Sequence, residues 1–238
     1  MTTPSRLVRV VFSRVRKVLM SSVRALGWTP VKGTRWLGSE SLVIDPDGVV
    51  GDRVFSPVSP SLVCLKASAY PQLMAWTGNL GELADADGRR ATVSYWGRPF
   101  DATVFDNAIA AELSELAGEP TLLARAQTRP GFIWDCPVSL LTSSELAGLE
   151  GPVERYRSNI VVDDADDPVV LRAGTRVELG ECVLELVRPI ERCVVIDRDP
   201  ITGAQLTPML GRLGPAVTLG WGCRVVRGGR VEREPATT

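Results

Sequence analysis

Residues 182–203 read CVLELVRPIERCVVIDRDPITG and join a strand pattern to a charged, turn-rich segment. The run Cys182–Val187 is rich in Val and Leu, which favours a β-strand, and Val194–Ile196 predicts another. Cys193 lies between the two, beside Arg192. A neighbouring guanidinium favours the thiolate, the form that ligates soft metals and attacks electrophiles. The segment therefore predicts a β-rich protein with a functional cysteine in a turn.

The rest of the chain has the same pattern of short Val, Leu and Ile runs bounded by Gly, Pro and Asp, which indicates a β-rich fold. Further strands are expected at residues 41–44, 91–96, 160–162, 176–179 and 223–226. One clear helix begins at Asn107 as N-cap and ends at Gly118. A second, short helix would be capped by Ser143 or Ser144 and run through Leu146.

The helix at 107–118 is a natural seam, so we expect a β domain at residues 23–106 and a second domain at 107–238. Residues 1–22 form a basic extension, in which apolar and basic side chains interleave. Such an arm could form an amphipathic helix on an anionic membrane surface. Because Met20 begins the run MSSVRALGWTPVKG, we favour the alternative that the preceding residues are an upstream extension without fixed structure.

Bulk composition excludes several classes of function. The formal net charge of -1 provides no overall field for polyanions, so no nucleic-acid partner is expected. No stretch approaches the ~20 apolar residues that span a bilayer, which predicts a cytoplasmic protein. The chain has 0 histidines, which excludes histidine-based nucleophilic catalysis and histidine-ligated zinc or haem.

The remaining cysteines and one acidic run are read as structural. The 5 cysteines are odd in number and show no CxxC spacing, so reduced thiols are expected. Four are interpreted as inert apolar residues: Cys64, Cys136, Cys182 and Cys223. The acidic run 163–167 lacks the glycine and the closing glutamate of a calcium loop, and is interpreted as a solvated connection.

Three more polar positions lie in turns beside strands. Lys32 precedes a glycine that would let a ligand approach, but on these residues alone a solvated turn lysine is favoured. Asp52 and Arg53 form either a structural ion pair or a site where Arg53 offers a planar fork to phosphate. Arg157 and Asn159 alternate just before a strand, so their side chains share one face.

These positions stand in the order found in the MOSC family, named for the C-terminal domain of molybdenum cofactor sulfurases. The chain resembles that family from about Val23 to Arg233, through TPVKG at 29–33, GDR at 51–53, YRSNIVV at 156–162, ERCVV at 191–195 and DPITG at 199–203. A looser match is DCPVSLLT at 135–142. Gly33 and Ser158 depart from the family's serine and proline, and Val195–Asp197 replaces threonines common in its reductases, so substrate contacts are expected to differ.

The resemblance implies a β-rich mixed α/β fold in which an N-terminal MOSC-type β domain packs on a C-terminal MOSC β-barrel with a few short helices. The implied cofactor is the pyranopterin molybdenum cofactor, placed in the cleft between them, with Cys193 as the metal ligand. The residues implied to bind its phosphate and pterin are Lys32, Arg53, Arg157 and Asn159, with Thr142 and Ser143 as weaker candidates. Arg192 would keep the thiolate of Cys193 deprotonated.

The implied activity is that of an oxidoreductase that reduces small N-hydroxylated or N-oxide substrates. Because the sequence shows no iron-sulfur cysteine set and no dinucleotide-binding glycine motif, electrons would come from a separate flavin or iron-sulfur protein. One alternative is a carrier of molybdenum cofactor or of sulfur that uses Cys193 as a persulfide site. Another is a scaffold of this fold without the cofactor.

Overall fold

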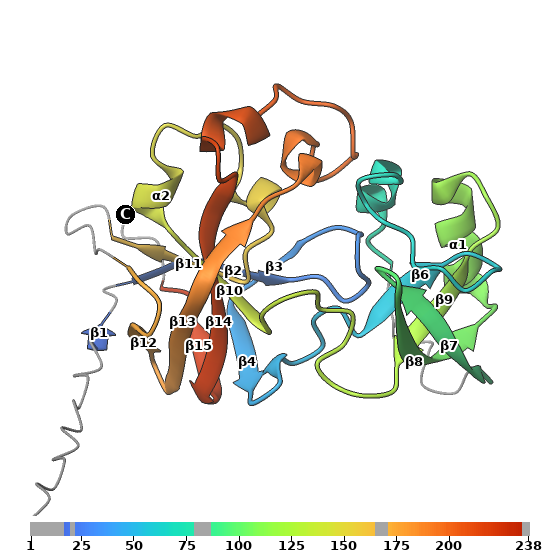
Figure 1. The fold of residues 1–238 in the computed structure, drawn as a ribbon, viewed down its shortest axis with the longest axis horizontal. Coiled ribbons are helices and arrows are strands. Elements are labelled where there is room, and N and C mark those ends of the chain that lie inside the picture. Colours follow the sequence, from blue (N-terminus) through green and yellow to red (C-terminus); the bar gives the residue numbers. More distant parts are fainter. Residues whose placement is uncertain (1–16, 20–21, 79–86, 165–170, 235–238) are drawn as a thin grey trace, which may run out of the picture.

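The computed structural model describes residues 17–19, 22–78, 87–164 and 171–234, which form two β-rich bodies side by side (Figure 1). The larger body holds an eight-stranded and a three-stranded sheet, and the smaller body a four-stranded sheet. Two α-helices, α1 (Ala108–Ala117) and α2 (Ser143–Leu146), occur in the described residues. The predicted β-rich class with few helices is confirmed.

The eight-stranded sheet of the large body has the order β1-β12-β13-β14-β10-β11-β2-β3. Its strands are β1 (Lys17–Leu19), β2 (Ser22–Trp28), β3 (Leu37–Ser39), β10 (Val138–Thr142), β11 (Ile160–Asp163), β12 (Arg176–Leu179), β13 (Cys182–Glu191) and β14 (Thr218–Arg227). The pairs β1-β12 and β10-β11 are parallel, and the other pairs are antiparallel.

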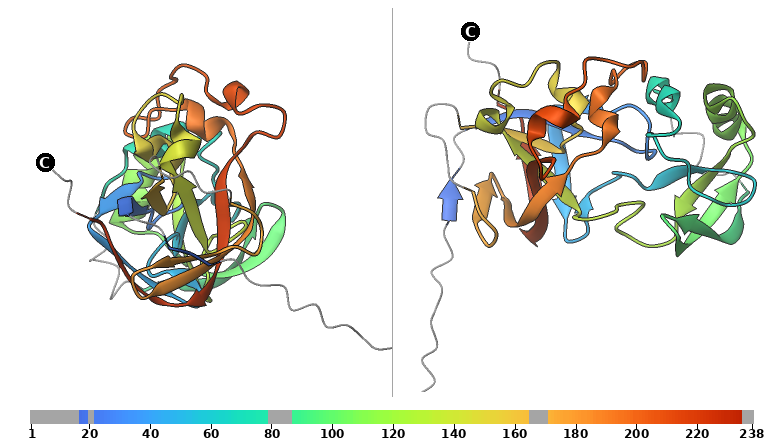
Figure 2. Two further views of the ribbon diagram at one scale, coloured as in Figure 1. Left: turned by 90° about the vertical axis from the view of Figure 1, so that its left-hand side faces the viewer. Right: turned by 45° about the horizontal axis from the view of Figure 1, so that its top comes forward.

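A three-stranded antiparallel sheet completes the large body with β15 (Gly229–Glu232), β4 (Ser41–Asp45) and β5 (Gly48–Val49). Side chains from both sheets share one apolar core, such as Ile44, Leu140 and Leu184. Figure 2 shows the large sheet from two further sides. Its edge strands, β1 and β3, do not pair with each other in the described residues, so the sheet is open and the expected closed barrel is not formed.

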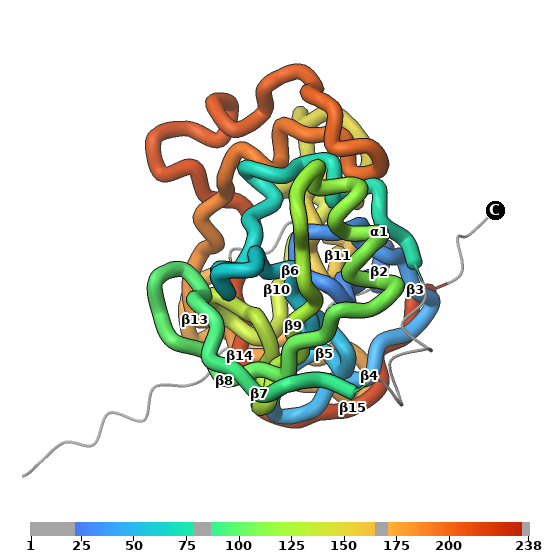
Figure 3. The backbone as a smooth tube through the Cα atoms, turned by 90° about the vertical axis from the view of Figure 1, so that its right-hand side faces the viewer, coloured from blue at the N-terminus to red at the C-terminus, as the bar shows by residue number. Residues whose placement is uncertain are grey.

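The small body is an antiparallel sheet in the order β6-β9-β8-β7, on which α1 packs (Figure 3). Its strands are β6 (Phe55–Val58), β7 (Arg89–Tyr95), β8 (Arg98–Phe105) and β9 (Leu122–Ala126). The apolar face of α1 places Ile109 and Leu113 against Phe105 and Leu123 of the sheet. A 3-10 turn, η1 (Pro71–Ala75), closes the same core through Leu73.

The two bodies do not correspond to the expected division of the chain at residue 107. Strands β2 to β5 lie in the large body, where Leu26 of β2 pairs with Ile160 of β11. Helix α1 lies inside the small body, between β8 and β9. The pairing of β2 with distant strands is a tertiary event, because local pattern fixes a strand but not its partner.

The expected unstructured extension at 1–22 largely falls outside the described residues, which begin at 17–19 and 22. Within it, Lys17–Leu19 forms β1 in parallel pairing with β12, and Ser22 begins β2. For these residues the expectation was wrong, because sheet pairing satisfies their backbone groups.

The signals predicted for the helix ends are confirmed for α1 but not for the cap of α2. Asn107 caps α1 by accepting the N–H of Ala110 at 3.0 Å, and Gly118 ends it with φ of 75°. For α2, the cap is Thr142 in a capping box with Glu145, rather than either serine that follows it.

The strand predicted at Val194–Ile196 is wrong. These residues lie in the 3-10 helix η4 (Val194–Asp197), where Ile196 is buried and Val194 is exposed. The carbonyl of Ile196 accepts a hydrogen bond from the guanidinium of Arg155, and the Asp197 carboxylate accepts the N–H of Leu210 at 2.9 Å. These long-range bonds turn the chain immediately after Cys193.

Gly27 in β2 provides a stability test, because a Cβ there would lie 2.1 Å from the ring of Trp36. That indole donates to the carbonyl of Ser158 at 2.9 Å, so it is not free to move away. We expect Gly27→Ala to lower the free energy of unfolding by about 1–3 kcal/mol, as overpacking does. The measurement is urea unfolding followed by circular dichroism.

The matched control is Gly211→Ala, because no atom lies within 4 Å of a Cβ added at Gly211. Equal stability of the two variants would contradict the close packing of Gly27 on Trp36.

Candidate functional site

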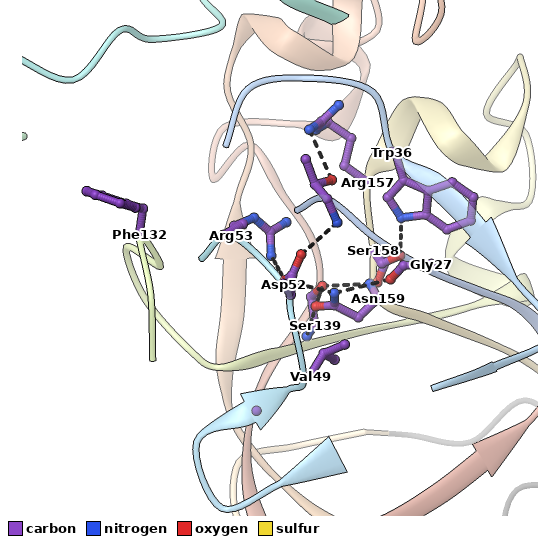
Figure 4. Close-up of polar contacts among 12 residues, drawn as sticks. Gly27, Trp36, Val49, Asp52, Arg53, Phe132, Ser139, Arg157, Ser158 and Asn159 are labelled. Carbon is purple, nitrogen blue, oxygen red and sulfur yellow. Dashed lines mark hydrogen bonds and ion pairs between the residues drawn. The ribbon is translucent and has the colours of Figure 1, made fainter. Parts of the chain in front are cut away.

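Asp52 is a buried carboxylate at which three segments of the chain meet (Figure 4). It accepts a hydrogen bond from the backbone N–H of Thr29 at 2.7 Å and from Nδ2 of Asn159 at 3.1 Å. It also forms an ion pair with the guanidinium of Arg53. A buried carboxylate needs such partners, because burial alone strongly disfavours its charged form. Asp52 therefore fixes Arg53 in place and links it to the strands of the large body.

Asn159 supports this junction with all of its amide atoms. Its Oδ1 accepts from the backbone N–H and the hydroxyl of Ser139, at 3.0 and 2.8 Å. Its Nδ2 donates to the carbonyl of Gly27 at 3.3 Å and to Asp52. An amide side chain has two donors and two acceptor positions, so none is left for a ligand. Asn159, expected to contact a cofactor, is a positioning residue in this structure.

Arg157 carries an unsatisfied donor. Its Nη2 donates to the carbonyl of Thr34 at 2.7 Å, but its Nη1 is buried without a partner in the described residues. Burial lowers the pKa of Arg157 to about 10, and Arg53 lowers it as well, whereas Asp52 and Cys193 raise it. These interactions show that Arg157 shares one electrostatic environment with Arg53 and Cys193.

Lys32 joins the same environment from the loop between β2 and β3. Its Nζ lies 5.2 Å from the centroid of the Tyr95 ring. The pKa of Lys32 is lowered to about 7, first by burial and then by the charges of Arg53 and Arg157, while Asp52 acts in the opposite direction. Lys32 is thus no solvated turn lysine: its charged form lacks sufficient negative neighbours and would be stabilised by an anion.

Arg192, at the end of β13, resembles Arg157 in its bonding. Its Nε and Nη1 donate to the carbonyls of Leu219 and Tyr156, at 2.7 Å each. Its Nη2 is buried without a partner among the described residues. Burial lowers the pKa of Arg192 to about 10, whereas Glu145 and Cys193 raise it.

Cys193 is the one exposed thiol among the five cysteines, all of which the structure describes. It stands at the N-cap of η4. Burial raises the pKa of the Cys182 thiol to about 11 and also raises the pKa values of Cys64 and Cys223. Cys136 is half-buried, and its pKa is raised to about 11, first by burial. Cys193 is therefore the accessible cysteine.

We call Lys32, Arg53, Arg157 and Arg192 the cationic cluster, because the charge of Arg53 acts on the other three. The cluster lies where the bodies meet, since a backbone bridge joins Val31 to Phe55 at the start of β6. With Asp52 as its buried carboxylate, it retains excess positive charge. The arrangement favours an anionic ligand.

Thr142 and Ser143 are engaged elsewhere. The hydroxyl of Thr142 accepts the N–H of Glu145 at 3.2 Å, at the start of α2. The hydroxyl of Ser143 donates to Asp163 at 2.6 Å and accepts the N–H of Asp164 at 3.0 Å. No described contact brings either hydroxyl to the cationic cluster. Asp164 is buried, so that part of the acidic run is a structural cap and not a solvated connection; residues 165–167 lie outside the described part.

Sequence reasoning missed several residues that shape the site. Tyr95 lies under Lys32, Ser139 locks Asn159, and the backbone N–H of Phe132 donates to the carbonyl of Arg53 at 2.7 Å. The strand pattern around Tyr95 and the DCPVSLLT segment that contains Ser139 were visible. Neither pattern says which distant residue it meets.

The described residues contain no group of three or more Cys, Asp or Glu side chains that could bind a metal by themselves. In the same residues no helix is both long and apolar enough to cross a membrane.

Comparison with known proteins identifies the fold family. The family model of the MOSC domain matches residues 132–235. Residues 132–235 therefore form a MOSC domain. This family is associated with the molybdenum cofactor, so the function of the protein is related to that cofactor. The matched MOSC region contains Arg157, Arg192 and Cys193, whereas Lys32 and Arg53 precede it.

Among solved structures, the chain is similar to the crystal structure of the YUAD protein from Bacillus subtilis, with 13% identity and a TM-score of 0.43. The alignment covers 89% of this chain and 91% of that one. No curated protein matches the sequence.

The lowered pKa of Lys32 predicts how stability changes with pH. The unfolded chain binds the Lys32 proton up to about pH 10.5, whereas the folded protein releases it near pH 7. Between these values the unfolded state binds more protons, so this lysine destabilises the fold fully below pH 7 and less as pH rises. We expect the stability advantage of Lys32→Met over wild type to be largest at pH 6.5 and to shrink by pH 9.5, in urea unfolding. A difference independent of pH would contradict the assignment.

Proposed function

We propose that the protein binds the pyranopterin molybdenum cofactor at the cationic cluster, with Cys193 as the metal ligand. The observation that supports this most is the pair of buried, unpartnered guanidinium nitrogens, Nη1 of Arg157 and Nη2 of Arg192. Leaving a buried donor unsatisfied costs about 1–3 kcal/mol, more for a charged group. Both guanidiniums interact electrostatically with Cys193. A ligand that brings acceptor oxygens to these nitrogens would satisfy them.

The donors fit the chemistry of the cofactor. Its phosphate is an anion, for which guanidinium and ammonium groups are the matching donors. Molybdenum in this cofactor is held by dithiolene sulfurs, and a protein thiolate is a compatible soft ligand. A single exposed cysteine is what such a metal needs from the protein, since its remaining ligands belong to the cofactor.

In this proposal the residues have separate roles. Arg53, Arg157 and Lys32 bind the phosphate and the pterin, while Asp52 and Asn159 hold Arg53 against the segment that enters β11. Arg192 is anchored by two backbone carbonyls and keeps positive charge near Cys193. When bound, the cofactor supplies two-electron redox chemistry, while the protein supplies binding and orientation.

We further propose that the activity is the reduction of small N-hydroxylated or N-oxide molecules. Such a reduction consumes two electrons and two protons, releases water and leaves the deoxygenated nitrogen compound. A separate flavin or iron-sulfur protein would donate the electrons. The positions that replace the family's threonines, Val195–Asp197, fold as part of a 3-10 helix in which Ile196 is buried, so the contacts on the substrate side differ from those of such family members.

The second candidate is a carrier of molybdenum cofactor or sulfur, with Cys193 as a persulfide. The exposure of Cys193 favours it, because sulfur transfer requires direct access of another protein to the thiol. The two functions differ in turnover. A reductase loaded with metal consumes substrate when a chemical reductant is supplied, and a carrier does not.

The first test is the molybdenum and pterin content of the protein purified from a host that makes the cofactor. Wild type should hold about one molybdenum per chain, and Cys193→Ala should retain at most a fifth of that while keeping part of the pterin. Cys136→Ala is the matched control, because Cys136 is half-buried and outside the cationic cluster. Equal molybdenum in Cys193→Ala and wild type would exclude Cys193 as the ligand.

The second test removes one cation. Arg157→Gln should lower pterin affinity by roughly tenfold or more, because a hydrogen bond to a charged group contributes about 1.5–3 kcal/mol. Pterin retained after dialysis against increasing salt measures the effect. Arg212→Gln is the control, since Arg212 forms an exposed ion pair with Glu150. Equal retention in both variants would argue against Arg157 as a cofactor contact.

A further inference from the structure

Two half-exposed tryptophans lie together on the small body. Trp96 is 44% exposed and Trp134 is 47% exposed, and their ring centroids are 5.3 Å apart with a tilt of 46°. Large aromatic rings contribute much buried area when they are covered, so a pair left half exposed marks an interaction site more often than a scattered surface residue does.

Trp96 has a strained backbone conformation. Trp96 and Gly97 form the tight turn between β7 and β8, with φ of 53° and 77°. Such turns favour Asn, Asp or Gly, and a bulky residue with positive φ is strained. Strained residues cluster at functional sites, which is consistent with a role for the exposed indole.

A cationic side chain lies over each indole ring. The Nζ of Lys66 lies 4.2 Å from the Trp96 ring centroid, and the guanidinium of Arg98 lies 4.4 Å from that of Trp134. Both cations are exposed, and in the described residues neither forms an ion pair with a carboxylate. The neighbouring acid, Asp135, is paired with Arg188 instead. The hydrogen-bond donors of both cations are thus available to an anion.

The tryptophan pair is continuous with the cationic cluster. The Trp134 ring meets the edge of Tyr95 at 6.3 Å, and Lys32 lies over that same tyrosine. The hydroxyl of Tyr95 donates to the carbonyl of Phe132 at 2.9 Å, and the N–H of Phe132 donates to the carbonyl of Arg53. A ligand on the tryptophans would therefore lie beside the cofactor site.

We propose that Trp96 and Trp134, with Lys66 and Arg98, form the substrate-binding rim of this site, and that the rim selects flat aromatic molecules that carry a negative charge. That the bound molecule is a substrate rests on the proposed function, but its binding to the rim requires no metal. The aromatic rings match a flat ring system by stacking, and the cations match its charge. The contact of Trp134 with Tyr95, over which Lys32 also lies, favours a small molecule over a protein segment.

The test is isothermal titration calorimetry of the full chain with 2-naphthoate. Wild type should bind it at least about fivefold more tightly than decahydro-2-naphthoate, which lacks the flat rings, and 2-naphthamide, which lacks the charge. Trp134→Leu and Arg98→Gln should each weaken 2-naphthoate binding by about fivefold. Arg125→Gln should not, although Arg125 also lies over an aromatic ring, 5.4 Å from the Phe105 centroid.

Thermal melting of each variant separates loss of binding from loss of fold, and Arg98→Gln changes only an exposed side chain. If wild type binds the three probes equally, or if Arg125→Gln weakens 2-naphthoate as much as Arg98→Gln does, the rim is not selective and the proposal fails. Absence of 2-naphthoate binding would leave the tryptophans to a protein partner and also overturn it. Failure of the cofactor proposal is seen separately, as missing molybdenum and pterin in a protein that still binds 2-naphthoate.

Discussion

The buried carboxylate of Asp52 is the contact on which the site depends. It receives the N–H of Thr29, the amide of Asn159 and the guanidinium of Arg53, which come from segments 23 and 107 residues away and from the next position in the chain. Because an unpaired buried carboxylate is unfavourable, these partners must converge when the protein folds. Their convergence places Arg53 next to the loop that contains Lys32 and next to Arg157, which precedes β11.

Asp52, with Glu145 near Arg192, does not balance the four cations of the cationic cluster. Burial and mutual repulsion lower the pKa values of Lys32, Arg157 and Arg192, so the charged forms of these residues destabilise the fold. A bound anion would reduce the repulsion among these cations and stabilise the fold by mass action. The site thus resembles other functional sites, in which stability is given up for binding.

The DPITG turn has a structural explanation of its own. The Asp199 carboxylate accepts the backbone N–H groups of Ile201 and Thr202, at 2.9 and 2.7 Å. Gly203, with φ of 75°, then packs so closely on the carbonyl of Pro71 in η1 that a Cβ would lie 2.0 Å from it. Arg35 donates to the carbonyl of Ile201 at 2.8 Å. The motif therefore docks the segment after Cys193 onto the small body.

The sequence by itself determined the local features: most strands, the caps Asn107 and Gly118 of helix α1, and the MOSC domain. It also singled out the cysteine and the cations that make up the candidate site. Only the tertiary structure decided that Asn159 is fully bonded inside the protein, that Ser143 caps a turn, and that the residues after Cys193 form a 3-10 helix. It also decided that β2 joins a distant sheet and that Trp134 meets Tyr95. The reason is physical: strand and cap signals act within a few residues, whereas the bond from Asn159 to Gly27 spans 132 positions and follows no local pattern.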